Sequence, residues 1–154
     1  MIRKTALAFS DNYYIDDDKQ PLHVEKKPKH ILLIEDNKSD VFLIRKMLRD
    51  AVMGEVFDFT DVARMVDALA LLDEHSFDLI IVDLSLLDID GSATVAALHA
   101  GAPHIPIIVH TGAQCPRLRE EAILCGARHY LIKGRESPFS FRFMVQQALV
   151  HAEM

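Results

Sequence analysis

The chain alternates between short, unbroken apolar runs and longer segments in which apolar residues recur every three or four positions. From residue 30 onward the apolar runs are rich in Ile, Leu and Val, which is typical of strands buried on both faces. We predict such strands at residues 31–34, 79–82, 105–109 and 130–132. A weaker run at 56–59 is apolar on one side only and fits a strand at the edge of a sheet.

The segments between these strands have the spacing of amphipathic helices. In the clearest of them, five apolar residues recur at intervals of three and four: Val62, Met65, Val66, Leu69 and Leu72. The predicted helices cover residues 40–52, 62–72, 92–100, 116–125 and 139–152. Gly101 and Gly126 stand where two of these helices are expected to end, because glycine is favoured at helix C-termini.

This alternation of strands and helices predicts an α/β domain with a parallel sheet covered on both faces. Right-handed crossovers place the carboxyl ends of all the strands along one edge of such a sheet. Ligands bind at that edge in open parallel sheets, so the residues that follow each strand are the first candidates for a functional site.

Residues 1–29 differ from the rest of the chain. They contain an acidic run at residues 16–18 and a basic run with a proline at residues 26–29, and their few apolar residues show no sustained period. We therefore expect a flexible N-terminal extension over residues 1–29 and one folded domain over residues 30–154.

Length, charge and cysteine content narrow the class of protein. The 154 residues fit one domain, and the net charge of -6 argues against nucleic-acid binding through a basic surface. No apolar run approaches the ~20 residues of a membrane helix, and the first residues lack the pattern of a secretory signal. Cys115 and Cys125 form no disulfide or zinc pattern. We expect a cytoplasmic protein that binds neither nucleic acid nor membrane.

Chemically active side chains follow four of the predicted strands. Glu35 and Asp36 follow the first, Asp83 the third, Thr111 ends the fourth, and Lys133 follows the fifth. Three carboxylates at one edge repel one another unless a cation compensates, and carboxylate oxygens suit Mg²⁺. A single Asp after a strand is more often a helix cap, but this combination indicates a site where a carboxylate attacks a phosphoryl group.

Four segments carry a resemblance to a known family: residues 31–37, 78–91, 106–112 and 126–133. In this order and at these strand ends, they resemble the receiver domain of two-component response regulators. The resemblance implies a doubly wound (βα)5 fold of the flavodoxin-like type. This fold is a three-layer sandwich with a five-stranded parallel sheet in the order 2-1-3-4-5.

The resemblance also implies a role for each residue of the motifs. Asp83 would be the phosphoacceptor, and Lys133 and Thr111 would contact the phosphoryl group. Tyr130 matches the aromatic switch position and would turn inward when Thr111 moves toward that group. The implied Mg²⁺ ligands are Glu35, Asp36, Asp83 and the backbone carbonyl of Ser85.

The chain departs from the family pattern at two positions. Leu87 and Gly134 stand where the family usually has proline. Neither change removes a chemical group, and we expect the loop after Lys133 to be differently shaped or more mobile. His110 is adjacent to the site, and we expect its side chain to point outward.

The resemblance implies phosphoryl transfer from a phosphohistidine of a sensor histidine kinase or a histidine phosphotransfer protein. The domain would assist its own phosphorylation and dephosphorylation without being an enzyme in the ordinary sense. Because no output domain follows residue 154 in this sequence, we expect signalling to an unidentified downstream protein. The contacts would lie on the surface of the fourth helix, fifth strand and fifth helix.

The last predicted helix has more apolar residues than one face can hold: Phe139, Phe141, Phe143, Met144, Val145, Leu149 and Val150. Either some of them contact a second copy of the chain or a kinase, or the first turn of the helix bends so that all are buried. The sequence alone leaves these two alternatives open.

Two other functions fit parts of the pattern. A pseudo-receiver would use the same fold as an interaction module and carry no phosphate. A haloacid-dehalogenase-like phosphatase also uses a strand-end Asp with Mg²⁺, but it needs a second Asp two residues later. Ser85 occupies that position, and the chain is short for a cap domain.

Overall fold

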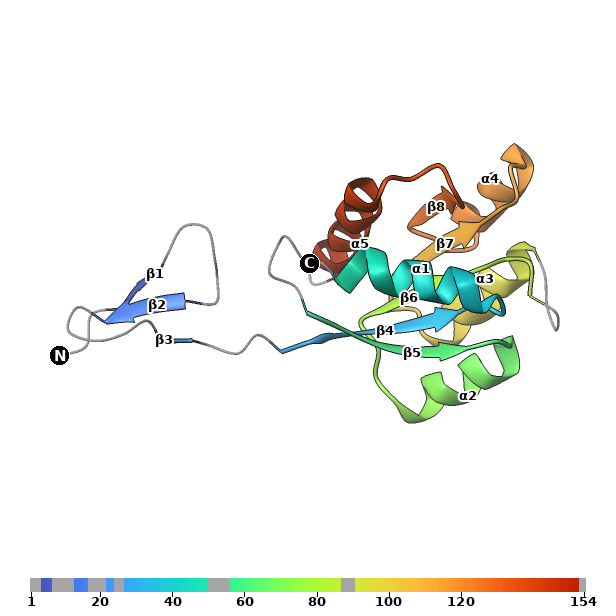
Figure 1. The fold of residues 1–154 in the computed structure, drawn as a ribbon. Helices are drawn as coiled ribbons and strands as arrows, with labels where there is room; N and C mark the ends of the chain where they lie inside the picture. Colours follow the sequence, from blue (N-terminus) through green and yellow to red (C-terminus); the bar gives the residue numbers. More distant parts are fainter. Residues whose placement is uncertain are drawn as a thin grey trace.

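The main body of the protein is a five-stranded parallel sheet with helices on both faces (Figure 1). The computed structural model describes residues 4–6, 13–16, 22–23, 27–49, 56–86 and 91–152. Within those ranges, no helix combines the length and the apolar character needed to cross a bilayer.

The sheet has the strand order that the resemblance implies. Its strands are β4 (Lys29–Ile34), β5 (Phe57–Val62), β6 (Leu79–Val82), β7 (Ile107–Thr111) and β8 (His129–Ile132). The spatial order is β5-β4-β6-β7-β8, and each neighbouring pair is parallel. Counted within the domain this is 2-1-3-4-5, which confirms the predicted fold and the edge position of the weaker strand.

The helices form two layers. They are α1 (Lys38–Arg49), α2 (Met65–Glu74), α3 (Ser92–Gly101), α4 (Pro116–Leu124) and α5 (Pro138–Ala152). Buried residues of α2, α3 and α4 belong to one hydrophobic core, and those of α1 and α5 belong to the other, on the opposite face of the sheet. The protein is therefore the predicted three-layer sandwich.

The central strands are apolar throughout because both of their faces are covered. In β4, Leu32 and Ile34 pack in the core beneath α2, α3 and α4, whereas Ile31 and Leu33 pack beneath α1 and α5. All four side chains are at most 1% exposed. Successive side chains of β4 thus pack in two separate cores, one on each face of the sheet. Glu35, which follows β4, is held between these two packed layers.

Several element boundaries differ from the prediction. Val62, predicted as the first residue of a helix, is instead the last residue of β5, because it pairs with Ile34 of β4, and α2 begins at Met65. Helix α1 begins at Lys38 because Asn37 caps it. Asn37 Oδ1 accepts hydrogen bonds from the backbone N–H groups of Ser39 and Asp40, at 2.9 and 3.1 Å. The predicted end of this helix, at residues 50–52, lies outside the described residues. Strand β7 begins at Ile107 because Pro106, directly before it, has no N–H to donate to a strand ladder.

A second, smaller sheet lies near the N-terminus. It consists of β1 (Lys4–Ala6), β2 (Tyr13–Asp16) and β3 (Leu22–His23), which pair antiparallel in that order. The sequence pattern does not predict these strands, because strands of two to four residues are too short to show a period. The division of the chain near residue 30 stays a prediction.

Candidate functional site

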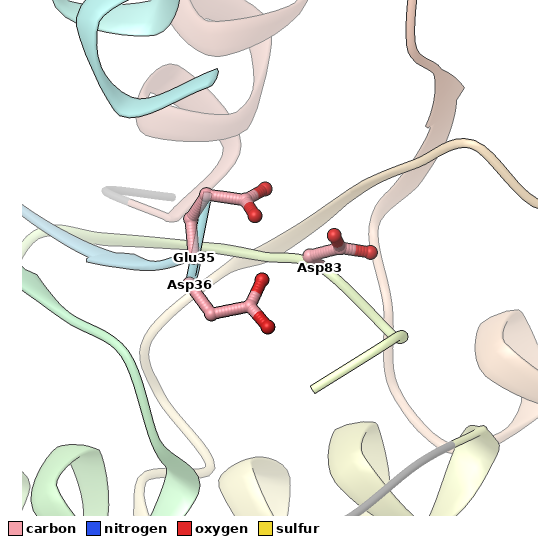
Figure 2. Close-up of side chains that lie close together, drawn as sticks. All are labelled: Glu35, Asp36 and Asp83. Atoms are coloured by element: carbon pink, nitrogen blue, oxygen red, sulfur yellow. The ribbon is translucent and has the colours of Figure 1, made fainter. Parts of the chain in front are cut away.

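Three carboxylates meet at the carboxyl edge of the sheet (Figure 2). Glu35 follows β4 and Asp83 follows β6, and the pairing of Ile34 with Val82 sets these two acids side by side. Asp36 is the next residue along the chain from Glu35. One oxygen from each of the three carboxylates lies within 4.8 Å of the others.

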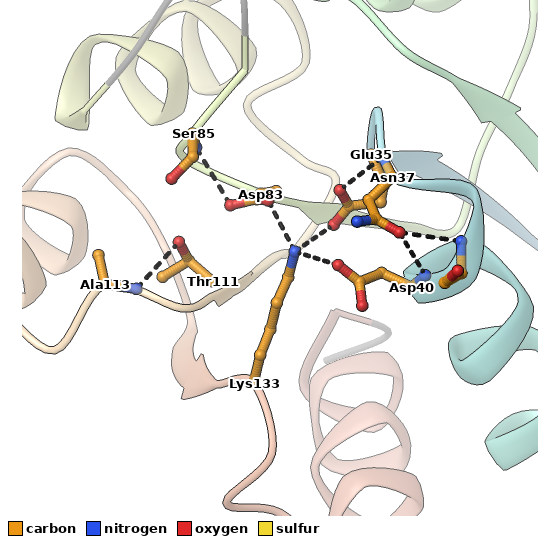
Figure 3. A network of polar contacts seen from close by, with 9 residues as sticks. Glu35, Asn37, Asp40, Asp83, Ser85, Thr111, Ala113 and Lys133 are labelled. Carbon is orange, nitrogen blue, oxygen red and sulfur yellow. Dashed lines mark hydrogen bonds and ion pairs between the residues drawn. The ribbon is translucent and has the colours of Figure 1, made fainter.

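Lys133 supplies the positive charge that this acidic cluster requires (Figure 3). It follows β8, and its Nζ lies 2.8 Å from Glu35 Oε2 and 2.8 Å from Asp83 Oδ2. A third carboxylate, Asp40 of α1, approaches the same Nζ to 2.7 Å. Although burial opposes the charged form, these contacts raise the pKa of the Lys133 ammonium well above its ordinary value, so it is charged at neutral pH.

Asp40 is not among the residues that the sequence predicts for this site. Its position is set by the start of α1, where Asn37 caps the helix and directs the first turn toward the sheet edge. The only signal in the sequence is an acidic residue in the first helical turn, and such residues usually serve the helix dipole. The contact with Lys133 joins residues 93 positions apart, so no local pattern could reveal it.

Burial and hydrogen bonding shift the pKa values of the two buried acids, Glu35 and Asp83, in opposite directions. Burial raises the pKa of Glu35 to about 7, although Lys133 acts in the opposite direction. Burial also acts to raise the pKa of Asp83, but the Lys133 ammonium, the Ser85 N–H and the Thr111 hydroxyl together hold it below its ordinary value. The Ser85 N–H donates to Asp83 Oδ1 at 3.1 Å. Asp83 is therefore ionised at neutral pH, as a nucleophile must be.

Thr111 and Tyr130 are joined through one residue of the loop after β7. The Thr111 side chain is fully buried, and its Oγ1 accepts a hydrogen bond from the Ala113 N–H at 3.5 Å. The Tyr130 hydroxyl donates to the Ala113 carbonyl at 2.7 Å. Thr111, the predicted phosphate contact, and Tyr130, the predicted switch residue, are thus linked by hydrogen bonds to the same residue, Ala113.

His110 contradicts the expectation that its side chain points outward. It is 7% exposed, and its ring packs edge-on against Phe141 of α5, with ring centroids 5.2 Å apart. Successive side chains of a strand point to opposite faces, so Thr111 and His110 face different layers. A His at the end of a strand is often solvated, but here α5 covers that face of the sheet.

The donor set fits a divalent metal ion. Glu35, Asp36 and Asp83 offer hard carboxylate oxygens, and Asp36 is partly exposed, which leaves room for the water ligands that Mg²⁺ usually retains. Of the four implied ligands, the structure brings these three together. The role of the Ser85 carbonyl stays a prediction.

The loop after Lys133 has the different shape that the sequence suggested. Gly134 adopts φ +82°, a conformation that proline cannot adopt because its ring fixes φ near −65°. The backbone therefore could not follow this path with the family's usual proline. Leu87, the other departure, lies outside the described residues.

A family comparison agrees with this geometry. The model of the response regulator receiver domain matches residues 31–139, which is most of the chain. The chain belongs to this family, whose members act in two-component signal transduction.

Curated relatives show the same similarity. Transcriptional regulatory protein ZraR of Salmonella typhimurium is 32% identical over 124 residues, which are 79% of this chain and 26% of that protein. Transcriptional regulatory protein CitT of Bacillus subtilis is 30% identical over 107 residues, or 68% of this chain and 45% of that protein. The chain spans about a quarter of the length of the first curated relatives it matches.

Solved structures share the fold. A CheY-like receiver domain protein of Methanospirillum hungatei superposes with a TM-score of 0.73 at 20% identity, covering 82% of this chain and 98% of that chain. The receiver domain of sensor histidine kinase PA1611 of Pseudomonas aeruginosa gives a TM-score of 0.68 at 25% identity, covering 80% and 99%. The latter structure has a magnesium ion coordinated in its active site cleft.

Proposed function

We propose that this receiver domain accepts a phosphoryl group on Asp83 from a phosphohistidine of a sensor histidine kinase or a histidine phosphotransfer protein, in the cytoplasm. One observation carries the proposal: the ionised Asp83 lies 2.8 Å from the Lys133 ammonium, at a sheet edge where Glu35 and Asp36 complete a metal-ligand set. A nucleophile, a fixed cation and a metal site in one place are what phosphoryl transfer needs.

The proposed step exchanges one bond to phosphorus for another. A carboxylate oxygen of Asp83 forms a bond to phosphorus while the bond from phosphorus to the donor imidazole nitrogen breaks. The imidazole nitrogen keeps the electron pair of that bond and takes up a proton from water. Lys133 donates to a phosphoryl oxygen during the transfer, and the Thr111 hydroxyl donates to another.

Mg²⁺ completes the site in this proposal. The residues that would hold it are Glu35, Asp36, Asp83 and the backbone carbonyl of Ser85, and the bound ion would offset negative charge on the phosphoryl oxygens. Lys133 alone offsets one negative charge, whereas the described cluster contains three carboxylates before any phosphoryl group arrives.

The output of the domain is proposed to pass through the loop after β7. If the Thr111 hydroxyl turns toward the phosphoryl group, the Ala113 N–H loses its partner, and the carbonyl of the same residue holds Tyr130. A local change at the site thereby reaches β8 and α4. We propose that a downstream protein reads the surface formed by α4, β8 and α5.

The test is covalent labelling with a small phosphodonor. Purified protein is incubated with phosphoramidate and Mg²⁺, and its intact mass is measured. We expect one added phosphoryl group on the wild type, none on Asp83→Asn, and one on Asp73→Asn, which removes an exposed carboxylate of α2. A pure interaction module would gain no mass, and equal labelling of Asp83→Asn would also overturn the proposal.

A further inference from the structure

We propose that Asp40 limits the reactivity of the phosphoacceptor site by occupying Lys133. This inference rests on the proposed function, because it concerns how phosphoryl donors reach Asp83. A lysine ammonium has three N–H donors. In this structure three carboxylates accept from Lys133: Glu35 at 2.8 Å, Asp40 at 2.7 Å and Asp83 at 2.8 Å (Figure 3). All of its donors are therefore engaged.

Asp40 is not needed to hold the ammonium in place. Glu35 and Asp83 have side chains that are 1% and 6% exposed, and both are fixed at the ends of central strands. The Asp40 side chain is 26% exposed and reaches the same nitrogen from the first turn of α1. Two rigid partners position Lys133, so the third partner chiefly adds negative charge.

That charge acts against an incoming phosphoryl donor in two ways. The donor is an anion, so a carboxylate beside Lys133 cancels part of the attraction that the ammonium exerts. The phosphoryl oxygen also needs an N–H of Lys133 that Asp40 now occupies. Removing the Asp40 charge leaves Lys133 charged and held by Glu35 and Asp83, and the neutral oxygen of Asp40→Asn competes less well with the donor for the third N–H.

The experiment compares Asp40→Asn with two controls. Asp40→Glu restores the charge on a longer side chain. Asp67→Asn removes the same group from the first turn of another helix, α2, where Asp67 pairs with Arg64 at 3.1 Å on the surface. Labelling rates with phosphoramidate are measured over a range of donor concentrations at saturating Mg²⁺, so that KM and kcat are separated.

We expect Asp40→Asn to lower KM for phosphoramidate by about threefold or more, with a smaller change in kcat, since the added attraction acts on the bound donor and the transition state alike. Asp40→Glu and Asp67→Asn should keep the wild-type KM. The affinity for beryllium trifluoride, followed by tyrosine fluorescence with Mg²⁺ present, should rise by a similar factor in Asp40→Asn. A second variant, Asp40→Ala, should behave like Asp40→Asn.

The outcomes separate this inference from the proposed function. If the wild type is labelled at Asp83 but KM of Asp40→Asn is unchanged or higher, the role of Asp40 is overturned and the phosphoacceptor function stands. An equal decrease of KM in Asp67→Asn would also overturn it, because the effect would then come from net charge alone. If the wild type is not labelled at all, the proposed function fails and this inference fails with it.

Discussion

The hydroxyl of Tyr130, on β8, donates a 2.7 Å hydrogen bond to the backbone carbonyl of Ala113, in the loop that follows β7. The Tyr130 side chain is already inside the protein, with 8% of the residue exposed. The family resemblance implies that this ring turns inward after phosphorylation. In this structure the Tyr130 ring is already buried and hydrogen-bonded to Ala113 before any phosphorylation. We therefore expect phosphorylation to change the loop that contains Ala113.

Removing this hydrogen bond should weaken the domain measurably. Tyr130→Phe keeps the ring but leaves the Ala113 carbonyl without its donor, and we expect the free energy of unfolding to fall by about 0.5–1.5 kcal/mol. Urea denaturation followed by circular dichroism measures the change. A free energy of unfolding that is the same in Tyr130→Phe and the wild type would contradict the prediction.

The buried Glu35 should make stability depend on pH. Burial raises its pKa from 4.5 to about 7, so the native state binds a proton that the unfolded state releases between these values. The free energy of unfolding therefore receives a contribution that declines as pH rises through this window, by up to about 1.4 kcal/mol per pH unit.

Glu35→Gln should abolish that contribution, because glutamine does not titrate. Urea denaturation is measured from pH 4 to 8 in buffer without divalent cations. The stability of Glu35→Gln relative to wild type should increase steadily with pH across the window. A difference that stays constant would show that the pKa of Glu35 is the same in both states.

His110 should affect the pH dependence of stability in the direction opposite to Glu35. Burial, assisted by the charge of Lys133, lowers its pKa from 6.5 to about 4, although Asp40, Asp83 and Glu136 oppose the shift. The unfolded state then binds a proton that the native state does not, so this contribution to the free energy of unfolding rises with pH over that window. In the wild type the contributions of Glu35 and His110 partly cancel.

His110→Phe should reveal the Glu35 contribution by removing its counterpart. The substitution keeps an aromatic ring against Phe141 and deletes a buried Nδ1 that has no hydrogen-bond partner among the described residues. We expect its stability relative to wild type to be highest near pH 4 and to decrease toward pH 7. The same denaturation series measures this, and a relative stability that rises with pH would contradict the assignment.

The fold could be predicted from the sequence because the central strands are buried on both faces and therefore read as unbroken apolar runs. The residues gathered at the site could be predicted for a related reason. Glu35, Asp83, Thr111 and Lys133 all end or follow parallel strands, and parallel strands share one carboxyl edge. Topology alone brings these residues together.

The features that were missed depend on contacts between distant side chains. Asp40 meets Lys133 only because α1 starts where Asn37 caps it, and the orientation of His110 depends on α5 covering that face. The strands β1, β2 and β3 are held by backbone pairing, which requires no side-chain pattern. None of these relationships leaves a period in the sequence.

Two phenylalanines of α5 should differ sharply in their contribution to stability. Phe141 is fully buried against His110 and the sheet, whereas Phe139 is 66% exposed. Phe141→Ala should lower the free energy of unfolding by about 3–5 kcal/mol, because it leaves a cavity in the core. Phe139→Ala should change it by less than about 0.5 kcal/mol. Urea denaturation of both variants checks the difference, and similar losses would contradict the observed helix orientation.

Three exposed apolar residues of α5 lie on one face of the helix. Phe139, Phe143 and Val150 are 66%, 43% and 57% exposed, and their spacings of four and seven residues place them on one face of the helix. The apolar residues of α5 are therefore not all buried. One face of the helix is exposed, and Phe141 and Val145 are buried on the other side.

We expect this face to mediate dimer formation when the site carries a phosphoryl mimic, because the α5 surface belongs to the proposed output face. Sedimentation velocity with beryllium trifluoride and Mg²⁺ should show a concentration-dependent dimer in the wild type. Phe143→Ser should shift the protein to monomer, whereas Phe42→Ser, which removes a phenylalanine of α1 that is 62% exposed, should leave the dimer intact. If the wild type stays monomeric at every concentration with the mimic bound, this face serves another partner and the dimer is ruled out.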